Sequence, residues 1–271
     1  GLRFSLAGVQ LKFSMIRSGG RFSLPAHDSR GDWIVKIGDV EYPGLAENEY
    51  TMLSWSSAAG FDVPERFLLE PGDLPAIQKY LPQEGFVLAV RRYDRTVGGP
   101  IHQEDFAQMI GSKKKYEGSY DQLGVVVRGL LGEDAFAEFV RRVVLTIAMG
   151  GNDAHLKNWS VVYRDERRPE LAPLYDQVST IAWPKLDRQL ALKLAGARDF
   201  GRIGSDSIRR IAAKAGADPA AAVDAASRTL KGLRESWADV LEGGAMLSDP
   251  VEAIRDHWRR VPLLRESGEL G

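Results

Sequence analysis

The chain has 271 residues, of which 44% are hydrophobic and 27% charged, a composition typical of a globular protein rather than a disordered or fibrous one. The 36 basic and 37 acidic residues give a formal charge of −1, which does not provide the broad positive field of a nucleic-acid-binding protein. The absence of cysteine excludes disulfides, thiolate zinc sites and thiol nucleophiles, and it favours a cytoplasmic location.

No stretch of the sequence reaches the roughly 20 apolar residues that a membrane-spanning helix needs, so we expect no membrane contact. The first residues, GLRFSLAG, lack the charged and apolar regions of a signal peptide. Residue 1 is Gly rather than Met, which indicates a segment or a processed form of a longer chain.

The first part of the chain is predicted to be rich in strands. Apolar and polar residues alternate over residues 11–24 on both sides of Ser18-Gly19-Gly20, which predicts a hairpin. Two further strands are expected in WIVKI (33–37) and FVLAVRRY (86–93). Helical spacing of apolar residues over 46–59 predicts a helix that ends at the next glycine. We therefore expect a sheet of about five strands with one helix laid across it.

The rest of the chain is predicted to be mostly helical. Two short β-like runs, GGNDAHLKNWSVVY and LAPLYDQVST, interrupt the helices and carry polar residues at their ends. The turn residues of RTVGGP predict a boundary near residues 94–102, between an N-terminal lobe of residues 1–95 and a C-terminal lobe of residues 96–271. The expected helices cover residues 104–110, 120–131, 134–149, 205–216, 219–241 and 248–260.

Several types of site are excluded because the motifs that they require are absent from the sequence. The histidines at positions 27, 102, 155 and 257 are too far apart for a His-x-x-x-His zinc pair. Neither the Gly-x-Ser-x-Gly of a serine hydrolase nor the glycine-rich phosphate motifs of common nucleotide-binding proteins occur.

One ordered set of polar residues is typical of protein kinases. Asn158 follows Asp153 by five residues and Asp176 lies 18 residues further on, as do a catalytic base and two magnesium ligands. Lys36 stands in an apolar strand and Glu49 on the following helix, where the two could form an ion pair. Each residue alone has a simpler explanation, such as turn capping for the aspartates or an edge-strand position for the lysine. Their joint order favours a phosphoryl-transfer site.

Seven segments, in order, resemble the HipA and HipT toxin kinases of bacterial toxin–antitoxin systems, and the short HipT type most of all. They are SLAGVQLKFS (5–14), PGLAENEY (43–50), VRRYDR (90–95), HQED (102–105), KYE (115–117), GGNDAHLKN (150–158) and PLYDQVS (173–179). The resemblance implies an α+β, two-lobe protein-kinase-like fold with a β-rich N-lobe and a mostly helical C-lobe.

The resemblance also implies a serine/threonine protein kinase that uses ATP and Mg²⁺, phosphorylates an aminoacyl-tRNA synthetase and so inhibits translation. Its partners would be an antitoxin similar to HipB, with DNA bound only through the antitoxin, and, where the preceding subdomain is a separate protein rather than a part missing from this chain, a subunit similar to HipS. The N-terminal subdomain of HipA would precede residue 1.

The resemblance assigns roles to particular residues. Asp153 would be the catalytic base, Asn158 and Asp176 the metal ligands, and Lys36 with Glu49 the phosphate-positioning pair. Phosphorylation of Ser5 by the kinase itself would displace the phosphate loop and switch the enzyme off. Nucleotide contacts are implied for the loop Ala7, Gly8, Val9, Gln10, Leu11 and Lys12, for the hinge Arg91, Arg92 and Tyr93, and for His155, Lys157 and Tyr175.

Two positions depart from the family pattern. Residue 91 is Arg where HipA has an acidic residue, and Ala7 stands where some HipT-like proteins have a second serine.

Other interpretations stay open. The same acidic set would serve a kinase-like enzyme acting on a small molecule, and a catalytically silent antitoxin-binding module would need no chemistry at all. Lys113–Lys115 is most simply a solvated loop, and a surface that faces tRNA is the less favoured interpretation. Tyr116 has no role that the sequence suggests.

Overall fold

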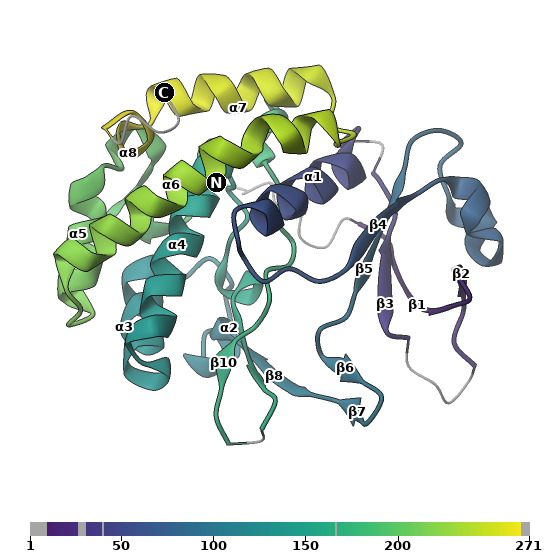
Figure 1. The fold of residues 1–271 in the computed structure, drawn as a ribbon, viewed down its shortest axis with the longest axis horizontal. Coiled ribbons are helices and arrows are strands. Elements are labelled where there is room, and N and C mark those ends of the chain that lie inside the picture. The colour runs from purple at the N-terminus through teal and green to yellow at the C-terminus, as the bar shows by residue number, and fades with distance from the viewer. Residues whose placement is uncertain (1–9, 27–30, 40, 166, 267–271) are drawn as a thin grey trace.

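A five-stranded antiparallel sheet and a group of helices form the two lobes of an α+β, kinase-like fold (Figure 1). The structure is a computed structural model, and it describes residues 10–26, 31–39, 41–165 and 167–266. Ser5 and the loop residues 7–9 therefore lie outside the described residues. No helix within the described ranges is long and apolar enough to cross a membrane.

The sheet has the strand order β2-β1-β3-β5-β4. The predicted hairpin is confirmed, with its turn at Gly19 and Gly20, whose φ angles of +55° and +81° favour glycine. The register sets Lys12 opposite Lys36, so both lysines reach the same end of the sheet. The strands are β1 (Lys12–Ser18), β2 (Arg21–Ser23), β3 (Trp33–Lys36), β4 (Arg66–Leu69) and β5 (Val87–Arg91).

Helix α1 (Leu45–Ala58) lies between the sheet and the helical lobe (Figure 1). It contacts β4 and β5 on one side and α6 (Pro219–Glu242) on the other. The indole nitrogen of Trp55 donates to the carbonyl oxygen of Leu233, 2.7 Å away, and its ring packs against Trp237 and Trp258. Buried indoles find a hydrogen-bond partner in this way, so α1 is joined firmly to the second lobe.

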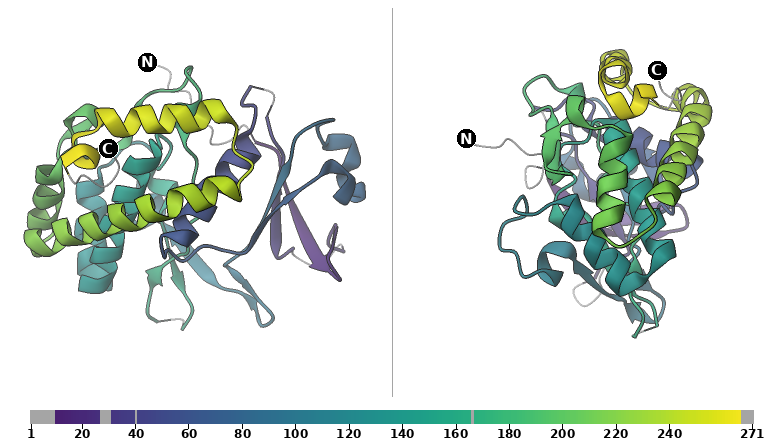
Figure 2. Two further views of the ribbon diagram at one scale, coloured as in Figure 1. Left: turned by 45° about the horizontal axis from the view of Figure 1, so that its top comes forward. Right: turned by 90° about the vertical axis from the view of Figure 1, so that its left-hand side faces the viewer.

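The core of the helical lobe surrounds α4 (Glu133–Met149), which is buried on nearly all sides from Val143 to Met149. Helices α6 and α7 run along the same side of the lobe (Figure 2) and both contact α4. The helices expected after residue 119 are confirmed, with small shifts of their ends. The others are α3 (Tyr120–Leu131), α5 (Ser205–Lys214), α7 (Ser248–Arg260) and α8 (Pro262–Glu266).

Short strands and helices connect these parts of the fold. A hairpin of β6 (Arg95–Thr96) and β7 (Gly99–Pro100) follows the sheet, and we propose that the lobe boundary lies there. The remaining elements are β8 (His102–Asp105), α2 (Phe106–Met109), β9 (Ser160–Tyr163), β10 (Glu170–Leu171), β11 (Gln189–Leu194) and β12 (Ala197–Asp199), with 3₁₀ turns at 71–73, 75–80, 156–158, 180–182 and 200–202.

The helix expected over 104–110 is partly wrong. Asp105 does begin a helix, because its carboxylate accepts from the backbone N–H of Gln108 at 2.8 Å, but that helix ends at Met109. Glu104 belongs instead to β8, which pairs with β9 opposite Val161. Pairing with β9, whose residues lie more than 50 positions away in the sequence, therefore decides the conformation of the residues just before the helix cap Asp105.

The β-like run expected over 171–180 is also mostly wrong. Only Glu170 and Leu171 pair as a strand, β10, and the chain then continues irregularly as far as the 3₁₀ turn at 180–182. Asp176 in this segment has φ +51°, in the left-handed region, which breaks any strand.

Asn48 of α1 joins the helix to this irregular segment. Its side-chain oxygen accepts from the backbone N–H of Ser179 at 2.9 Å and its nitrogen donates to the Ser179 carbonyl at 3.1 Å. Asn48 is 1% exposed and Ser179 is fully buried. The Ser179 carbonyl also accepts from the backbone N–H of Ala182 at 3.4 Å, so the Ser179 N–H is the group that depends on Asn48 alone.

We expect Asn48→Ala to lower the free energy of unfolding by about 2 kcal/mol, because it removes two buried hydrogen bonds and leaves the Ser179 N–H unpaired. Urea denaturation followed by circular dichroism measures the change. Ser57→Ala, at an exposed position of the same helix, is the control and should change it by less than about 0.5 kcal/mol. Equal effects of the two substitutions would contradict the role of Asn48.

Candidate functional site

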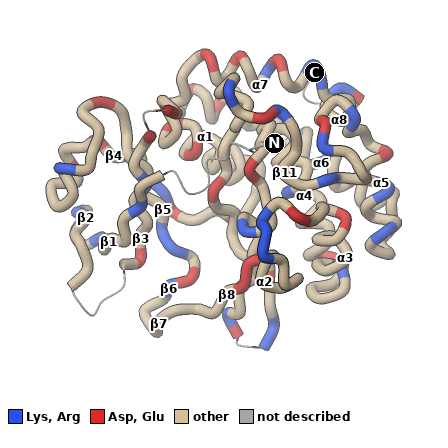
Figure 3. The backbone as a smooth tube through the Cα atoms, turned by 180° about the vertical axis from the view of Figure 1, so that it is seen from behind, with Lys and Arg blue, Asp and Glu red and all other residues tan. Residues whose placement is uncertain are grey.

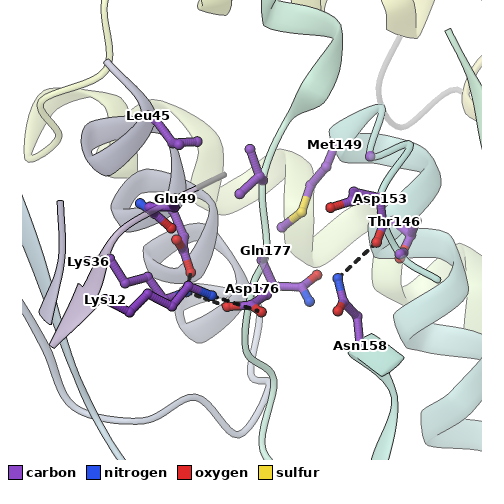
Figure 4. Close-up of a pocket in the computed structure, with 14 residues that line it drawn as sticks. Lys12, Lys36, Leu45, Glu49, Thr146, Met149, Asp153, Asn158, Asp176 and Gln177 are labelled. Atoms are coloured by element: carbon purple, nitrogen blue, oxygen red, sulfur yellow. Dashed lines mark hydrogen bonds and ion pairs between the residues drawn. The ribbon is translucent and has the colours of Figure 1, made fainter. Parts of the chain in front are cut away.

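A cleft of about 720 Å³, part of it open to solvent, lies where the sheet, α1 and two loops of the helical lobe meet (Figure 4). One loop follows α4 and the other follows β10. Seven residues singled out in the sequence line this cleft: Gln10, Lys12, Lys36, Glu49, Asp153, Asn158 and Asp176.

The ammonium group of Lys36 lies between two carboxylates. It is hydrogen-bonded to Glu49 of α1 and to Asp176 of the loop after β10. The side chains of Lys36 and Glu49 are only 5% and 2% exposed. Burial by itself lowers the pKa of Lys36, but the two carboxylates outweigh burial and raise it, so the ammonium stays charged at neutral pH.

Asp176 is held as a carboxylate in a strained backbone conformation. Burial raises its pKa, but the nearby charges of Lys36 and Lys12 outweigh this and lower the pKa to about 2. Lys12 Nζ lies 3.9 Å from the Asp176 carboxylate. The left-handed backbone of a non-glycine residue costs about 1–3 kcal/mol and is most often found at functional sites.

The loop after α4 presents Asp153 and Asn158 to the cleft (Figure 4). The helix ends at Gly150, with φ +63°, where a Cβ would lie 2.5 Å from the side chain of Ile181, so only glycine fits. Asn158 Nδ2 donates to the carbonyl oxygen of Asp153 at 2.8 Å. The hydroxyl of Tyr116 donates to Asp153 Oδ1 at 2.6 Å. These two bonds fix the loop and the direction of its carboxylate.

His155 is buried next to this carboxylate. Its Nε2 lies 3.9 Å from Asp153 Oδ1, and its ring meets the ring of Tyr116 edge-on with centroids 5.2 Å apart. Burial and the charge of Lys115 lower its pKa to about 4, so it is neutral at pH 7. Neither ring nitrogen has a hydrogen-bond partner among the described residues. A neutral imidazole can donate one hydrogen bond and accept another, so a polar ligand could satisfy it.

A second cavity adjoins the cleft on the side of the sheet. The rings of Tyr93 and Tyr175 lie in it with centroids 5.6 Å apart. The guanidinium group of Arg92 forms two hydrogen bonds, of 2.8 and 2.7 Å, to Asp94, and that of Arg91 lies 3.5 Å from Glu65. Because both arginines are turned toward carboxylates, the cavity keeps flat aromatic walls that suit a planar ring. Its lining includes Lys12, Lys36, Glu49, Arg91, Arg92, Tyr93, Gln103, Tyr175 and Asp176.

Three of the proposed nucleotide contacts within the described residues line neither cavity: Leu11, Lys157 and His155, of which His155 is buried. The side chain of Leu11 is exposed to solvent. That of Lys157 points into a separate hollow that it shares with Lys113, Lys114 and Lys115. These positions place Leu11 and Lys157 at the margin of the site.

The sequence did not identify every residue that shapes the site. Tyr116 contacts the Asp153 carboxylate directly, yet the sequence offered only its place in the KYE motif as a signal. Gln103, which accepts from the Tyr93 hydroxyl at 2.5 Å, was marked only by its place in the HQED segment, just before the helix expected over 104–110. Thr146 and Met149 line the cleft but fit the apolar core pattern of α4.

The side chains in the cleft fit a magnesium ion and a phosphate chain. Asn158 uses its amide nitrogen on the Asp153 carbonyl, so its amide oxygen is the atom left to act as a ligand beside the Asp176 carboxylate. Magnesium typically takes one or two protein oxygens and completes its shell with water and phosphate. Gln10 Nε2 is buried without a partner among the described residues and could donate to a phosphate oxygen.

Comparison with known sequences identifies relatives. The family model of the HipA-like C-terminal domain matches residues 4–237. The Sinorhizobium fredii protein named "Putative kinase Y4dM" is 38% identical over 98% of this chain and 66% of its own length. "Putative kinase Y4mE" from the same bacterium is 32% identical over 80% of this chain and 52% of its own length. A "Putative kinase" of Haemophilus influenzae is 30% identical over 70% of this chain and 57% of its own length. The chain thus spans about half to two thirds of the length of these relatives.

Solved structures show the same fold. HipA of Shewanella oneidensis, determined in a complex with HipB and its operator DNA, superposes with a TM-score of 0.80 at 20% identity, covering 99% of this chain and 68% of HipA. The proinflammatory kinase CtkA of Helicobacter pylori superposes with a TM-score of 0.56 at 12% identity, covering 93% of this chain and 90% of CtkA. Both likenesses support the two-lobe kinase-like fold.

The electrostatic arrangement predicts a pH dependence of stability. The pKa of Asp176 is about 2, below its ordinary value of 3.8, so the carboxylate stabilises the folded state above pH 3.8 and loses this effect as the pH falls through 2. We expect Asp176→Asn to be destabilising at pH 5 and less so at pH 3, as measured by urea unfolding. Because Asn tolerates the left-handed backbone as Asp does, the variant and the wild type have a similar backbone strain at this position. If the difference in free energy of unfolding between wild type and Asp176→Asn were the same at pH 5 and pH 3, the low pKa of Asp176 would be contradicted.

Proposed function

The chain belongs to the HipA-like C-terminal domain family, and from this membership we propose that it is a kinase that transfers the γ-phosphate of ATP to a serine or threonine hydroxyl of a protein. The observation that carries the proposal is the convergence on one cleft of Lys36, Glu49 and Asp176 with the loop of Asp153 and Asn158. Phosphoryl transfer depends mainly on positioning and on stabilising charge, and this set of groups supplies both.

Each group has a role in this reaction. Lys36, oriented by Glu49, would hold the α- and β-phosphates. Asp153 would orient the acceptor hydroxyl and take its proton as the new oxygen–phosphorus bond forms and ADP leaves. A magnesium ion at Asn158 and Asp176 would neutralise charge on the phosphates. The Tyr93 and Tyr175 rings and the backbone beside them would hold the adenine, and neutral His155 would contribute a hydrogen bond near the phosphates.

We further propose that the protein is a toxin of the short HipT type, acting in the cytoplasm on an aminoacyl-tRNA synthetase to inhibit translation. The Shewanella HipA was determined together with HipB and operator DNA, which supports an antitoxin partner here and DNA binding only through that partner. The near-neutral charge of this chain agrees with a protein partner more than with direct DNA contact.

We expect Asp153→Asn to lower the rate of phosphoryl transfer by about 10²–10⁴-fold, because the amide keeps the shape of the side chain but cannot accept the proton. Incubating the purified protein and a cell lysate with labelled ATP measures transfer to proteins. Asp224→Asn, at an exposed position of α6, is the matched control and should keep full activity. Label that appears only in small molecules would support the small-molecule alternative, and near-normal transfer by Asp153→Asn would refute the assigned base.

We also expect the protein to phosphorylate its own Ser5, which lies before the phosphate loop in the sequence. Mass spectrometry after incubation with ATP should find one phosphate on the peptide that contains Ser5, and the modified protein should lose transfer activity because the added charge repels the phosphates of ATP. Ser5→Ala should remain active for longer, whereas Ser18→Ala, an exposed serine at the end of β1, should behave as wild type. Phosphate on other residues only would contradict this regulatory site.

A further inference from the structure

The loop of Asp153 begins at the carboxyl end of α4. Three residues separate Met149, the last residue of α4, from Asp153. A helix leaves its last four carbonyl groups without a partner inside the helix. Here each of these four carbonyls, from Ile147 to Gly150, accepts a hydrogen bond from a side chain elsewhere in the chain. The start of the catalytic loop is therefore held by residues that are distant in sequence.

Helix α7 supplies two of the four donors. Trp258 Nε1 donates to the Ala148 carbonyl at 2.8 Å, and His257 Nε2 donates to the Ile147 carbonyl at 2.7 Å. The Ile147 carbonyl also accepts from the backbone N–H of Gly150 at 3.1 Å, whereas Trp258 is the sole donor to Ala148 within the described ranges. Because Ala148 is fully buried, its carbonyl depends on Trp258 rather than on water.

The other two donors, Ser179 and Thr180, belong to the irregular segment after β10. Their hydroxyls donate to the carbonyls of Met149 and Gly150, at 2.7 and 3.0 Å. The Thr180 hydroxyl also accepts from the backbone N–H of Asn152 at 2.7 Å. Helix α7 packs on the 3₁₀ turn in this segment. The end of α4, this segment and α7 thus form one junction next to the cleft.

The ring of His257 is buried, and it meets the ring of Phe200 edge-on with centroids 4.6 Å apart. Burial, with the charges of Arg188 and Arg260, lowers the pKa of His257 to about 4, against the opposing effect of its hydrogen bond to Ile147. The ring is therefore neutral at pH 7. Because a carbonyl oxygen can only accept, the proton of the neutral ring lies on Nε2.

Trp258 also contacts the helix that carries Glu49. The centroid of its ring lies 5.8 Å from that of Trp55 in α1 and 5.1 Å from that of Trp237 in α6. One side chain thus contacts both α1, which presents Glu49, and the end of α4, which leads to Asp153.

The pattern of residues along α7 directs both side chains inward. Charged residues recur along this helix (Figure 3), and those from 255 to 260 are exposed, whereas His257 and Trp258 are buried. An amphipathic helix packs its less polar face on the core. The pattern that makes α7 fold against the lobe therefore also brings its two donors to the end of α4.

We propose that Trp258 and His257 are positioning residues for phosphoryl transfer, which hold the end of α4 and so place the Asp153 carboxylate against the acceptor hydroxyl. The inference rests on the proposed kinase function and adds to it two residues from a part of the chain without site motifs. A buried carbonyl that loses its donor is costly, so the helix end shifts toward another partner. A shift of about 1 Å in a catalytic group can lower a rate about 10²-fold.

Trp258→Phe and Trp237→Phe form a matched pair. Both remove an indole N–H from the same aromatic cluster, but the Trp237 nitrogen has no partner in the part of the chain that the structure describes. With labelled ATP and lysate proteins, Trp258→Phe should lower the transfer rate at saturating ATP about tenfold or more. The KM for ATP should stay within about twofold, because Lys36 and Glu49 lie on other elements. Trp237→Phe should behave as wild type.

Two substitutions of His257 test the second hydrogen bond. His257→Met removes the donor and keeps a buried side chain of similar size, whereas the amide of His257→Gln can still donate to the Ile147 carbonyl. We expect His257→Met to lower the transfer rate and His257→Gln to restore most of it. The loss should be smaller than in Trp258→Phe, because the Ile147 carbonyl keeps its bond from Gly150. If Trp258→Phe does not fold, this pair decides the inference.

Hydrogen exchange followed by mass spectrometry tests the position of the loop without requiring activity. Peptides that cover residues 150–158 should exchange about tenfold faster in Trp258→Phe than in wild type or Trp237→Phe, while peptides from the sheet should be unchanged. Equal effects of the two tryptophan variants, equal effects of the two His257 variants, or a change confined to the KM for ATP would overturn the positioning role.

Failure of the kinase function gives a different result. If wild type transferred no phosphate to any protein or to itself, the proposed function would be wrong whatever the exchange rates. If wild type were active and the exchange of residues 150–158 in Trp258→Phe matched that in wild type, this inference alone would be overturned.

Discussion

The ammonium group of Lys36, held between the carboxylates of Glu49 and Asp176, joins three parts of the chain that are far apart in sequence. Charges removed from water cost several kcal/mol unless they are paired, so β3, α1 and the loop after β10 can be packed together only if these side chains meet. The second carboxylate creates a surplus of negative charge, which Lys12 offsets from the neighbouring strand. The cleft is organised around this group of charges.

The position of Glu49 depends on helices that carry no sequence motif. Helix α1 is fixed on its far side by the Trp55 hydrogen bond to Leu233 and by packing against the tryptophans of α6 and α7. Asn48, next to Glu49 on the same helix, ties α1 to Ser179, three residues after Asp176. The carboxyl-terminal helices therefore hold the two carboxylates at a fixed separation, which gives them a part in the function of the site.

Local sequence patterns predicted correctly the helices whose stability depends on residues within the segment. They did not predict the short strands, whose conformation depends on pairing with distant parts of the chain. The helices over Tyr120–Leu131 and Ser248–Arg260 match their predicted limits because their apolar spacing and termini lie within the segment itself. Strand β4 was not located, and Glu104 was misassigned, because short strands are stabilised by partners elsewhere in the chain. The same limit applies to Tyr116, whose contact with Asp153 spans 37 positions.

The sequence by itself determined the chemical types and the order of the candidate site residues: Lys36, Glu49, Asp153, Asn158 and Asp176 were all proposed from their spacing and flanking patterns. It also indicated the fold, through a β-rich beginning and a helical remainder. Only the tertiary structure decided that the Lys36 ammonium lies between two carboxylates, that Asp176 adopts a left-handed backbone and that Lys157 faces a lysine-lined hollow. These features arise from packing between distant segments, and no local pattern of residues encodes the direction in which a side chain points once such segments meet.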